Sequence, residues 1–561
     1  ADLTMSTQQK TTNMKTSSVK RSLAAVFSLA IICSCGKGIP APNVVTKPKD
    51  PKQQMASNLK EYLEKEYPSE VTNVEVTSDK VIIKGSCGGS GTYLLAEITP
   101  WQDVTEMETY PYTEKISGKS FTVTVDRIAK QREEIDYDKV FSKWAVVKVD
   151  EDKQTLDSHA RYADDVAPKA SPAALPLKSK KGFGAGDLGL YFEDCKEMGV
   201  GGITMNVLLD GYLTGEGKGY SYGGRTYSLG NIKGYVDNVT QNAGKMDLVV
   251  SAIILCRTDN IFKDPENTGG NYTMPNLTTA KAFNMYAAAL EHMASTHWQP
   301  GKRISHWIMH NEVDYASEWT NMGDQPMMRY LDRYIKSMRV CYNIVRQWDQ
   351  NATVFGSFTH CWAKAGGAYA PKTLLEKTVE YSKAEGDFRW GVAYHPYPQD
   401  LTKPSFWIND TQASFSMNSK YVTFKNLEVI DAWINQKDNY YKGTTKRLLF
   451  LSEQGTNSPS YSQQDLELQA AGGAWAWKKA SKLNGIDAIL WHNWADNKAE
   501  GGLRIGLRTF DEGGIAGFTR KPVWFVWKAA GTPEEDSVFD QYKTILGISD
   551  WDSIMGTVSG N

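Results

Sequence analysis

The sequence has no excess of positive charge and few cysteines. Its 63 Lys and Arg residues are balanced by 65 Asp and Glu residues, giving a formal net charge of −2. A general nucleic-acid-binding surface normally leaves a basic excess, so we expect no nucleic-acid partner. Of seven cysteines, the five beyond the N-terminal region are widely spaced. This spacing indicates neither a disulfide framework nor a thiolate metal site, and we expect five single buried thiols.

The sequence also lacks a membrane-spanning run near its N-terminus. The apolar stretch from Leu23 to Ile32 is too short to cross a bilayer, and it follows three basic residues between positions 15 and 21. This arrangement is typical of an export signal. The tetrad at 32–35, Ile-Cys-Ser-Cys, resembles the lipobox of bacterial lipoproteins. The resemblance implies that Cys35 is diacylated and that the protein is an exported lipoprotein of a Gram-negative-type bacterium. It would lie at the outer membrane or cell surface, or on the periplasmic face.

Composition and periodicity divide the remaining chain. We expect a leader with the signal over 1–36 and a Pro- and Lys-rich flexible tether over 37–58. Between 71 and 150, short segments alternate apolar and polar residues with period two, which predicts a small all-β sandwich over 59–163. Residues 164–180 are rich in Pro, Ala and Ser and should form a linker. A catalytic domain would then occupy 181–561.

Beyond residue 180, strand patterns alternate with amphipathic helical ones, the signature of β–α units around a parallel sheet. Eight strand candidates occur, which predicts a (β/α)8 barrel: 182–186, 202–210, 247–255, 303–310, 352–358, 389–395, 447–453 and 486–492. The first strand runs into GFGAGDLG, which imitates a dinucleotide-binding turn. Phe and Ala stand between its glycines, so we expect no dinucleotide site and no cofactor.

In a barrel of this kind the active site lies at the carboxyl ends of the strands. Strand four is followed by His310, Asn311 and Glu312, and strand seven ends at Glu453. The two glutamates should therefore face each other across the barrel mouth. Glycoside hydrolysis needs two carboxyl groups of this kind on either side of the bond to be cut.

An Asn-Glu pair after strand four and a Glu after strand seven resemble the large clan of retaining (β/α)8 glycoside hydrolases, although Val313 stands where proline is common. The resemblance implies that Glu312 is the acid/base, that Asn311 binds the sugar 2-hydroxyl and that Glu453 is the nucleophile. It also implies a ring residue after strand six that orients the nucleophile and a strand-eight tryptophan under the sugar. Tyr397 or His395 matches the ring residue, and Trp491 matches the tryptophan.

Further polar residues follow other strands. The four histidines at strand ends, His310, His360, His395 and His492, could bind sugar hydroxyls, tune Glu312 or form a metal cluster. Metal-dependent barrel hydrolases usually carry HxH on strand one, which is absent from 182–186, so we expect no metal. Arg257, after strand three, is either a salt-bridge partner in the mouth or a contact for an acidic sugar.

The sequence therefore predicts a lipid-anchored, exported enzyme with a β-sandwich and a (β/α)8 barrel. It would cleave β-glycosidic bonds of a poly- or oligosaccharide by double displacement. Two alternatives stay open: an inactive cell-surface glycan-binding protein, and a metal-dependent hydrolase on the same barrel. The segments after strands two, three, six and eight are long (211–230, 257–276, 396–415 and 496–514) and suit the walls of a carbohydrate cleft.

Overall fold

The computed structural model describes residues 50–184, 186, 188–258 and 261–560. The predicted leader, its Cys35 and most of the predicted tether lie outside these residues. Within them, no helix combines the length and the apolar character needed to cross a bilayer. The five cysteines beyond the N-terminal region are all unpaired and buried, as predicted.

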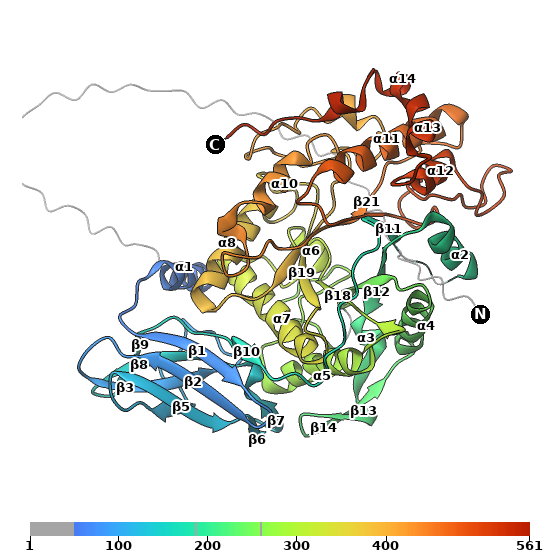
Figure 1. Cartoon of the computed structure of the whole chain (residues 1–561). Coiled ribbons are helices and arrows are strands. Elements are labelled where there is room, and N and C mark those ends of the chain that lie inside the picture. The colour runs from blue at the N-terminus through green and yellow to red at the C-terminus, as the bar shows by residue number, and fades with distance from the viewer. Residues whose placement is uncertain (1–49, 185, 187, 259–260, 561) are drawn as a thin grey trace, which may run out of the picture.

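The first element, helix α1 (Pro51–Glu64), corrects the predicted tether, which was expected to extend to residue 58. Asp50 caps the helix by accepting a hydrogen bond from the backbone N–H of Lys52, and Pro51 occupies the first turn, where its missing N–H costs nothing. The helix buries Leu59 and Tyr62 and packs on α7 (Met327–Trp348) and α8 (Pro371–Glu385) of the barrel (Figure 1). Residues 51–58 are therefore part of the folded body.

The β-sandwich is formed as predicted, but its strand β10 (Asp165–Val166) lies within the segment 164–180 that was predicted to be a linker. One sheet has the strand order β10-β1-β2-β5 and the other β4-β3-β8-β9. Period-two alternation buries Val81 and Ile83 of β2 between the sheets. The strands are β1 (Glu70–Val76), β2 (Lys80–Ser86), β3 (Thr92–Ile98), β4 (Thr113–Lys115), β5 (Ser120–Asp126), β8 (Lys143–Asp150), β9 (Lys153–Leu156) and β10 (Asp165–Val166), with a hairpin of β6 (Ile128–Arg132) and β7 (Ile135–Asp138) beside them.

The eight predicted barrel strands all form, and they close into one parallel barrel. Its strands are β11 (Lys181–Gly184), β12 (Gly202–Leu208), β15 (Val249–Leu255), β18 (His306–Met309), β19 (Thr353–Phe358), β20 (Trp390–Tyr394), β21 (Leu449–Gln454) and β22 (Ala488–Trp491). Every residue of β15 is buried, because a barrel strand has side chains in the lumen on one face and helices on the other. Gly182 and Gly202 allow close packing: a Cβ on Gly182 would lie 2.3 Å from the carbonyl oxygen of Gly202.

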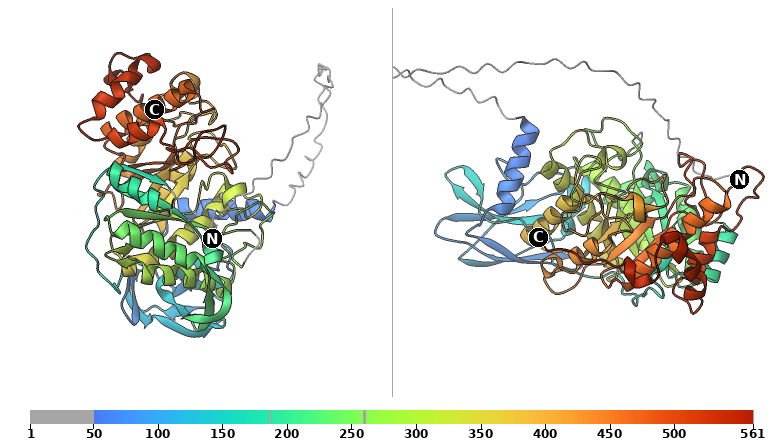
Figure 2. Two further views of the ribbon diagram at one scale, coloured as in Figure 1. Left: turned by 90° about the vertical axis from the view of Figure 1, so that its right-hand side faces the viewer. Right: turned by 90° about the horizontal axis from the view of Figure 1, so that it is seen from above.

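The outer layer consists of helices and short accessory strands. The helices are α2 (Gly189–Met198), α3 (Leu209–Tyr212), α4 (Ile232–Gly244), α5 (Ala280–Thr296), α6 (Ala316–Trp319), α7 (Met327–Trp348), α8 (Pro371–Glu385), α9 (Phe406–Asn409), α10 (Glu428–Ile434), α11 (Gln463–Lys482), α12 (Pro522–Ala529), α13 (Glu535–Phe539) and α14 (Lys543–Leu546). A two-stranded pair, β16 (Trp298–Gln299) and β17 (Lys302–Arg303), precedes β18. The sandwich lies at one end of the molecule and α12–α14 at the other (Figure 2).

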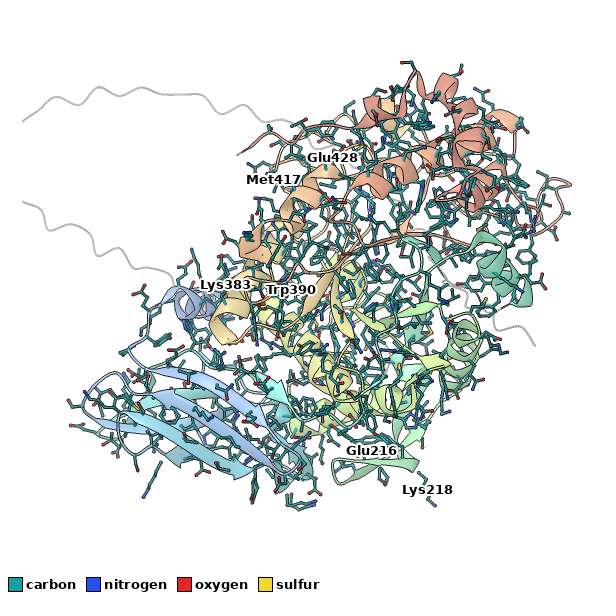
Figure 3. All side chains as sticks on the ribbon, viewed as in Figure 1. Glu216, Lys218, Lys383, Trp390, Met417 and Glu428 are labelled. Atoms are coloured by element: carbon teal, nitrogen blue, oxygen red, sulfur yellow. The ribbon has the colours of Figure 1, made fainter. Side chains whose placement is uncertain are left out.

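The long segment after strand two is not an irregular loop but a hairpin of β13 (Leu213–Tyr222) and β14 (Arg225–Leu229). Gly223 and Gly224 form its two-residue turn with φ of 56° and 74°, a conformation that favours glycine. The backbone N–H of Asp136 in β7 donates to the carbonyl of Gly223 at 2.9 Å. The hairpin, which carries Glu216 and Lys218 in Figure 3, thus reaches the sandwich rather than the barrel mouth.

Buried polar contacts join the sandwich to the barrel. Nζ of Lys143 lies 2.7 Å from a carboxylate oxygen of Glu385, and each side chain is only 3% exposed. Tyr62 donates a hydrogen bond to the same oxygen at 3.0 Å. Lys336 of α7 donates to Asp103 at 2.8 Å. Because each group has its partner in the other domain, the two domains form one structural unit.

Candidate functional site

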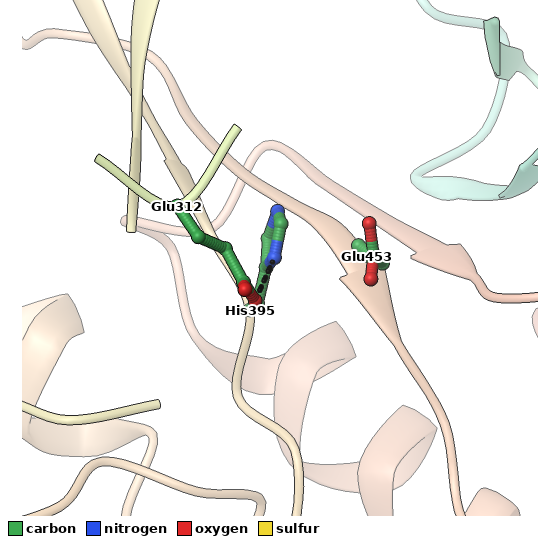
Figure 4. A group of neighbouring side chains, drawn as sticks. All are labelled: Glu312, His395 and Glu453. Atoms are coloured by element: carbon green, nitrogen blue, oxygen red, sulfur yellow. Dashed lines mark hydrogen bonds and ion pairs between the residues drawn. The ribbon is translucent and has the colours of Figure 1, made fainter. Parts of the chain in front are cut away.

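The two predicted glutamates meet at the carboxyl ends of their strands. Glu312 follows β18, and its backbone N–H donates to Oγ of Ser357 on β19 at 3.0 Å. Glu453 lies in β21. Figure 4 shows His395 between them, hydrogen bonded to Glu312. One side-chain nitrogen of His395 and one carboxylate oxygen from each glutamate all lie within 4.8 Å of one another.

Glu312 has a partner on each carboxylate oxygen. Nδ1 of His395 lies 2.9 Å from Oε1, and Nε1 of Trp319 donates to Oε2 at 3.2 Å. Burial disfavours the charged carboxylate, but the hydrogen bond from His395 and the charges of His395 and His360 outweigh it. Together they hold the pKa of Glu312 below its ordinary value.

His395 shows the complementary shift. Burial disfavours the imidazolium, yet the charge of Glu453 and the hydrogen bond and charge of Glu312 raise the pKa of His395 above its ordinary value. Nε2 of the same ring lies 3.5 Å from Oγ of Ser357. Glu312 and His395 therefore each stabilise the charged form of the other.

Tyr397 contacts Glu453, as the resemblance implied. Its hydroxyl donates to Oε1 of Glu453 at 3.0 Å. Burial and the charges of Glu453, Glu500 and Glu312 raise the pKa of Tyr397 well above its ordinary value, so the hydroxyl keeps its proton. Of the two ring residues considered, Tyr397 contacts the strand-seven glutamate and His395 the strand-four glutamate.

His492 lies beside this group. Its ring is 6.4 Å from that of Tyr397, and its Nε2 is 3.0 Å from Oε1 of Glu500. Burial opposes protonation, but the charges of Glu500 and Glu453 prevail and raise the pKa of His492 to about 9. His492 is therefore a cation at neutral pH.

Aromatic and charged residues form the edge of the site. Trp319 stacks on Tyr272 with ring centroids 4.9 Å apart, and His360 lies 5.5 Å from the ring of Tyr421. Burial lowers the pKa of His360. Arg257 forms the salt bridge predicted as one of its two roles, with Nη2 2.6 Å from Oδ2 of Asp210.

Two predicted substrate-binding residues face away from the mouth, which corrects their assignment. His310 is buried, with Nδ1 2.8 Å from the carbonyl oxygen of Ile254 and Nε2 3.3 Å from Oγ of Ser337 on α7. Burial lowers its pKa to about 4. Trp491 is fully buried and donates to the carbonyl of Ile505 at 2.7 Å. Both point into the packing around the strands, where no sugar can contact them.

Asn311 is also buried, and its side-chain oxygen finds no hydrogen-bond donor among the residues that the structure describes. Its contact with a sugar hydroxyl stays a prediction. The predicted alternative of a four-histidine metal cluster is not formed. Of the four, only His395 belongs to a potential metal-ligating group within the described residues, together with Glu312 and Glu453.

Sequence reasoning missed several residues of the site. Trp319 and Glu500 bind its members from the segments after β18 and β22, and Ser357 does so from inside β19. Trp319 follows Glu312 by seven residues in a short helix, a proximity that could have suggested a contact. Glu500 had no such signal, because its place depends on how the long segment 496–514 folds.

Solved structures of modest similarity include glycoside hydrolases. A family 39 glycoside hydrolase from the gut symbiont Bacteroides cellulosilyticus WH2 is 15% identical, with a TM-score of 0.45 and 83% of each chain covered. A Bacteroides uniformis β-glucuronidase is 12% identical (TM-score 0.37), with 82% of this chain covered but only 49% of that one. For a Ruminococcus gnavus β-glucuronidase the identity is 11%, the TM-score 0.36 and the coverage 82% and 68%. The chain thus spans about half the length of the B. uniformis enzyme.

No curated protein matches the sequence. A family model described as "Family of unknown function (DUF5722)" matches residues 173–554, which include all eight barrel strands and every residue of the site described above. Because the match extends over more than half of the sequence, the chain belongs to the DUF5722 family.

Proposed function

We propose that this protein is a retaining glycoside hydrolase that cleaves β-glycosidic bonds of a poly- or oligosaccharide. The observation that carries the proposal is the pair Glu312 and Glu453, whose carboxylate oxygens approach within 4.8 Å across the barrel mouth. Retaining enzymes hold their two carboxyl groups about 5–5.5 Å apart, whereas inverting enzymes need about 6.5–9.5 Å to admit a water molecule. The short separation favours attack by a carboxylate on the sugar.

Glu453 is the proposed nucleophile. The hydroxyl of Tyr397 donates to one of its oxygens and fixes the orientation of the carboxylate. The other oxygen attacks the anomeric carbon while the bond from that carbon to the leaving oxygen breaks. This step gives a covalent glycosyl-enzyme on Glu453.

Glu312 is the proposed acid/base, and His395 supplies its proton. A general acid must hold a proton when the leaving oxygen departs, yet the pKa of Glu312 is lowered by its histidine partner. The Nδ1–H of His395 lies 2.9 Å from Oε1 of Glu312, so a proton can move along this bond to the carboxylate as negative charge develops on the leaving oxygen. In the second step Glu312 takes a proton from water, which attacks the anomeric carbon and releases Glu453.

Turnover tests the proposal. The protein should release reducing ends from at least one member of a polysaccharide panel and hydrolyse a matching aryl β-glycoside. Glu453→Ala should reduce kcat by several orders of magnitude on every substrate. Glu312→Ala should still form the glycosyl-enzyme from an aryl glycoside with an acidic phenol and then stall, because no base activates water. Glu376→Ala, in α8 on the outer layer, is the control and should keep full activity.

Azide separates the two roles. It needs no base, so with Glu312→Ala it should restore turnover and give the β-glycosyl azide. With Glu453→Ala it should displace the leaving group directly and give the α-glycosyl azide. Equal, modest losses in both variants without any azide product would refute the assignment. Absence of turnover on every glycan, with binding retained, would instead support the glycan-binding alternative.

A metal-dependent hydrolase is a second candidate, because Glu312, His395 and Glu453 could together ligate a cation. Their present hydrogen bonds compete with that role, since Nδ1 of His395 faces Glu312 and Tyr397 donates to Glu453. A ligating nitrogen must present a lone pair rather than a proton. Activity that is lost on dialysis against EDTA and restored by a divalent cation would favour this candidate over double displacement.

The proposed location rests on the sequence alone. The tetrad at 32–35 supports diacylation of Cys35 and anchoring of the exported protein to a bilayer, with residues 37–50 between the lipid and helix α1. Anchoring would keep the enzyme at the bacterial envelope.

A further inference from the structure

We propose that the sugar bound between Glu312 and Glu453 carries no carboxylate or other anionic group, so that the substrate is a neutral glycan rather than a uronic-acid-containing one. This inference rests on the proposed function and narrows its substrate class. It follows from the charges of the side chains that surround the site.

The site already holds a cluster of carboxylates. One carboxylate oxygen of Glu312 and one of Glu453 lie within 4.8 Å of each other. Glu500 lies 3.0 Å from Nε2 of His492, whose ring is 6.4 Å from that of Tyr397, the residue that donates to Glu453. The same three carboxylates raise the pKa of His492. A further carboxylate on the sugar would enter a partly buried space in which like charges repel.

The cations of the site are already matched by protein carboxylates. His395 is paired with Glu312 at 2.9 Å, and His492 with Glu500 at 3.0 Å. Burial lowers the pKa of His360, which disfavours its charged form.

Arg257, the sequence-predicted candidate for an acidic sugar, is engaged in the same way. Its Nε donates to Oδ2 of Asp210 at 2.7 Å, and its Nη2 lies 2.6 Å from the same oxygen. The Asp210 side chain is only 4% exposed, so the pair is anchored on the protein side. Asp210 already compensates the charge of this guanidinium, which weakens its attraction for a sugar carboxylate.

Lys364 is a cation near the site that has no carboxylate partner among the contacts described for it. It is exposed, its Nζ lies 3.3 Å from the hydroxyl of Tyr421 and 5.4 Å from that ring, and Tyr421 in turn contacts His360. Lys364 is not among the main charges acting on Glu312 or His395.

Matched aryl glycosides test the inference directly. The 4-nitrophenyl β-glucoside and β-glucuronide differ only in CH2OH against COO⁻ at C5, and the galactoside and galacturonide form a second pair. At pH 6 we expect kcat/KM to be at least about a hundredfold higher for the neutral member of whichever pair is cleaved. Equal or faster hydrolysis of the uronide would overturn the inference, and loss of that activity in Lys364→Met would identify the binding residue.

A pair of variants tests whether the carboxylates around the site cause the preference for a neutral sugar. Glu500→Gln removes one carboxylate of the cluster together with the partner of His492, so the negative charge beside the sugar falls and the uronide-to-neutral ratio of kcat/KM should rise about tenfold. Glu512→Gln is the matched control on the same segment, because Glu512 pairs with Arg504 at 2.8 Å in a half-exposed position. Its ratio should equal that of the wild type. An unchanged ratio in Glu500→Gln would overturn the charge argument.

Binding separates this inference from the proposed function. If neither the polysaccharide panel nor any aryl glycoside is cleaved, glycoside hydrolysis is refuted, and ligand-detected NMR with glucose, galactose and mannose against their uronates decides the inference by itself. Binding of a neutral sugar but not its uronate would support it. Binding of a uronate, or of none of the six, would overturn it.

Discussion

Removal of the Tyr397 hydroxyl is the sharpest single test of how the site is organised. Tyr397→Phe deletes one oxygen that donates to Glu453 at 3.0 Å and keeps the ring that packs near His492. The expected result is a lower kcat/KM with the fold intact, because the nucleophile loses the bond that fixes its orientation.

The size of the loss follows from the type of hydrogen bond. A bond to a charged acceptor contributes about 1.5–3 kcal/mol. If that amount is lost from the transition state, kcat/KM falls by about 10- to 150-fold. The free energy of unfolding should change less, because the carboxylate of Glu453, which loses this donor, is partly exposed to solvent.

Tyr394→Phe is the matched control. Tyr394 ends β20 only three residues earlier, and its buried hydroxyl donates to the carbonyl of Cys361 at 2.8 Å, outside the carboxylate pair. This variant should lose stability but keep kcat/KM within about twofold. Steady-state kinetics and urea unfolding of both variants measure the contrast. Equal kinetic losses in the two variants, or no loss in Tyr397→Phe, would refute the role of this bond.

Three further predictions concern the acid/base pair, the domain interface and the anchor. In His395→Gln, Glu312 is the only residue of the pair that can hold the proton for the leaving oxygen. The alkaline limb of the pH profile of kcat/KM should therefore move to lower pH. An unmoved limb would contradict the transfer of a proton from His395. Glu385→Gln should lower the free energy of unfolding, measured in urea, by about 3 kcal/mol, because the buried charge of Lys143 loses its partner. The control Glu376→Gln in the same helix should lower it by less than about 0.5 kcal/mol. Similar values for the two variants would contradict the contribution of this ion pair to the domain interface. Cys35→Ala should release the exported protein from membranes on fractionation, and a wild type that is already fully in the soluble fraction would contradict lipidation.

The fold was accessible from the sequence because its signals are local. All eight barrel strands were predicted, since buried parallel strands separated by amphipathic helices give repeated apolar segments. The sandwich was equally visible from period-two alternation in segments such as Glu70–Val76. Glu312 and Glu453 could be paired across 141 positions because a closed barrel brings every strand end to one face.

The errors at strand ends concern the direction in which a side chain points. Successive side chains in a strand point to opposite sides, so a shift of one residue decides whether a side chain faces the lumen or the helices. Trp491 points outward and packs against α12, with its ring 5.3 Å from that of Trp527, while the next residue, His492, lies in the site. Beyond the end of β18 at Met309 the alternation no longer applies: His310 contacts α7, whereas Glu312, with a φ of 35°, faces Glu453.

The sequence by itself determined the barrel, the sandwich and the two glutamates, because periodicity and chain order depend on neighbouring residues. Only the tertiary structure decided what surrounds the glutamates and what holds the domains together. Glu500 acquires its role by meeting His492, and Lys143 by meeting Glu385 across the domain interface. Such contacts join side chains whose positions depend on how long segments fold and domains dock, and no local pattern records that geometry.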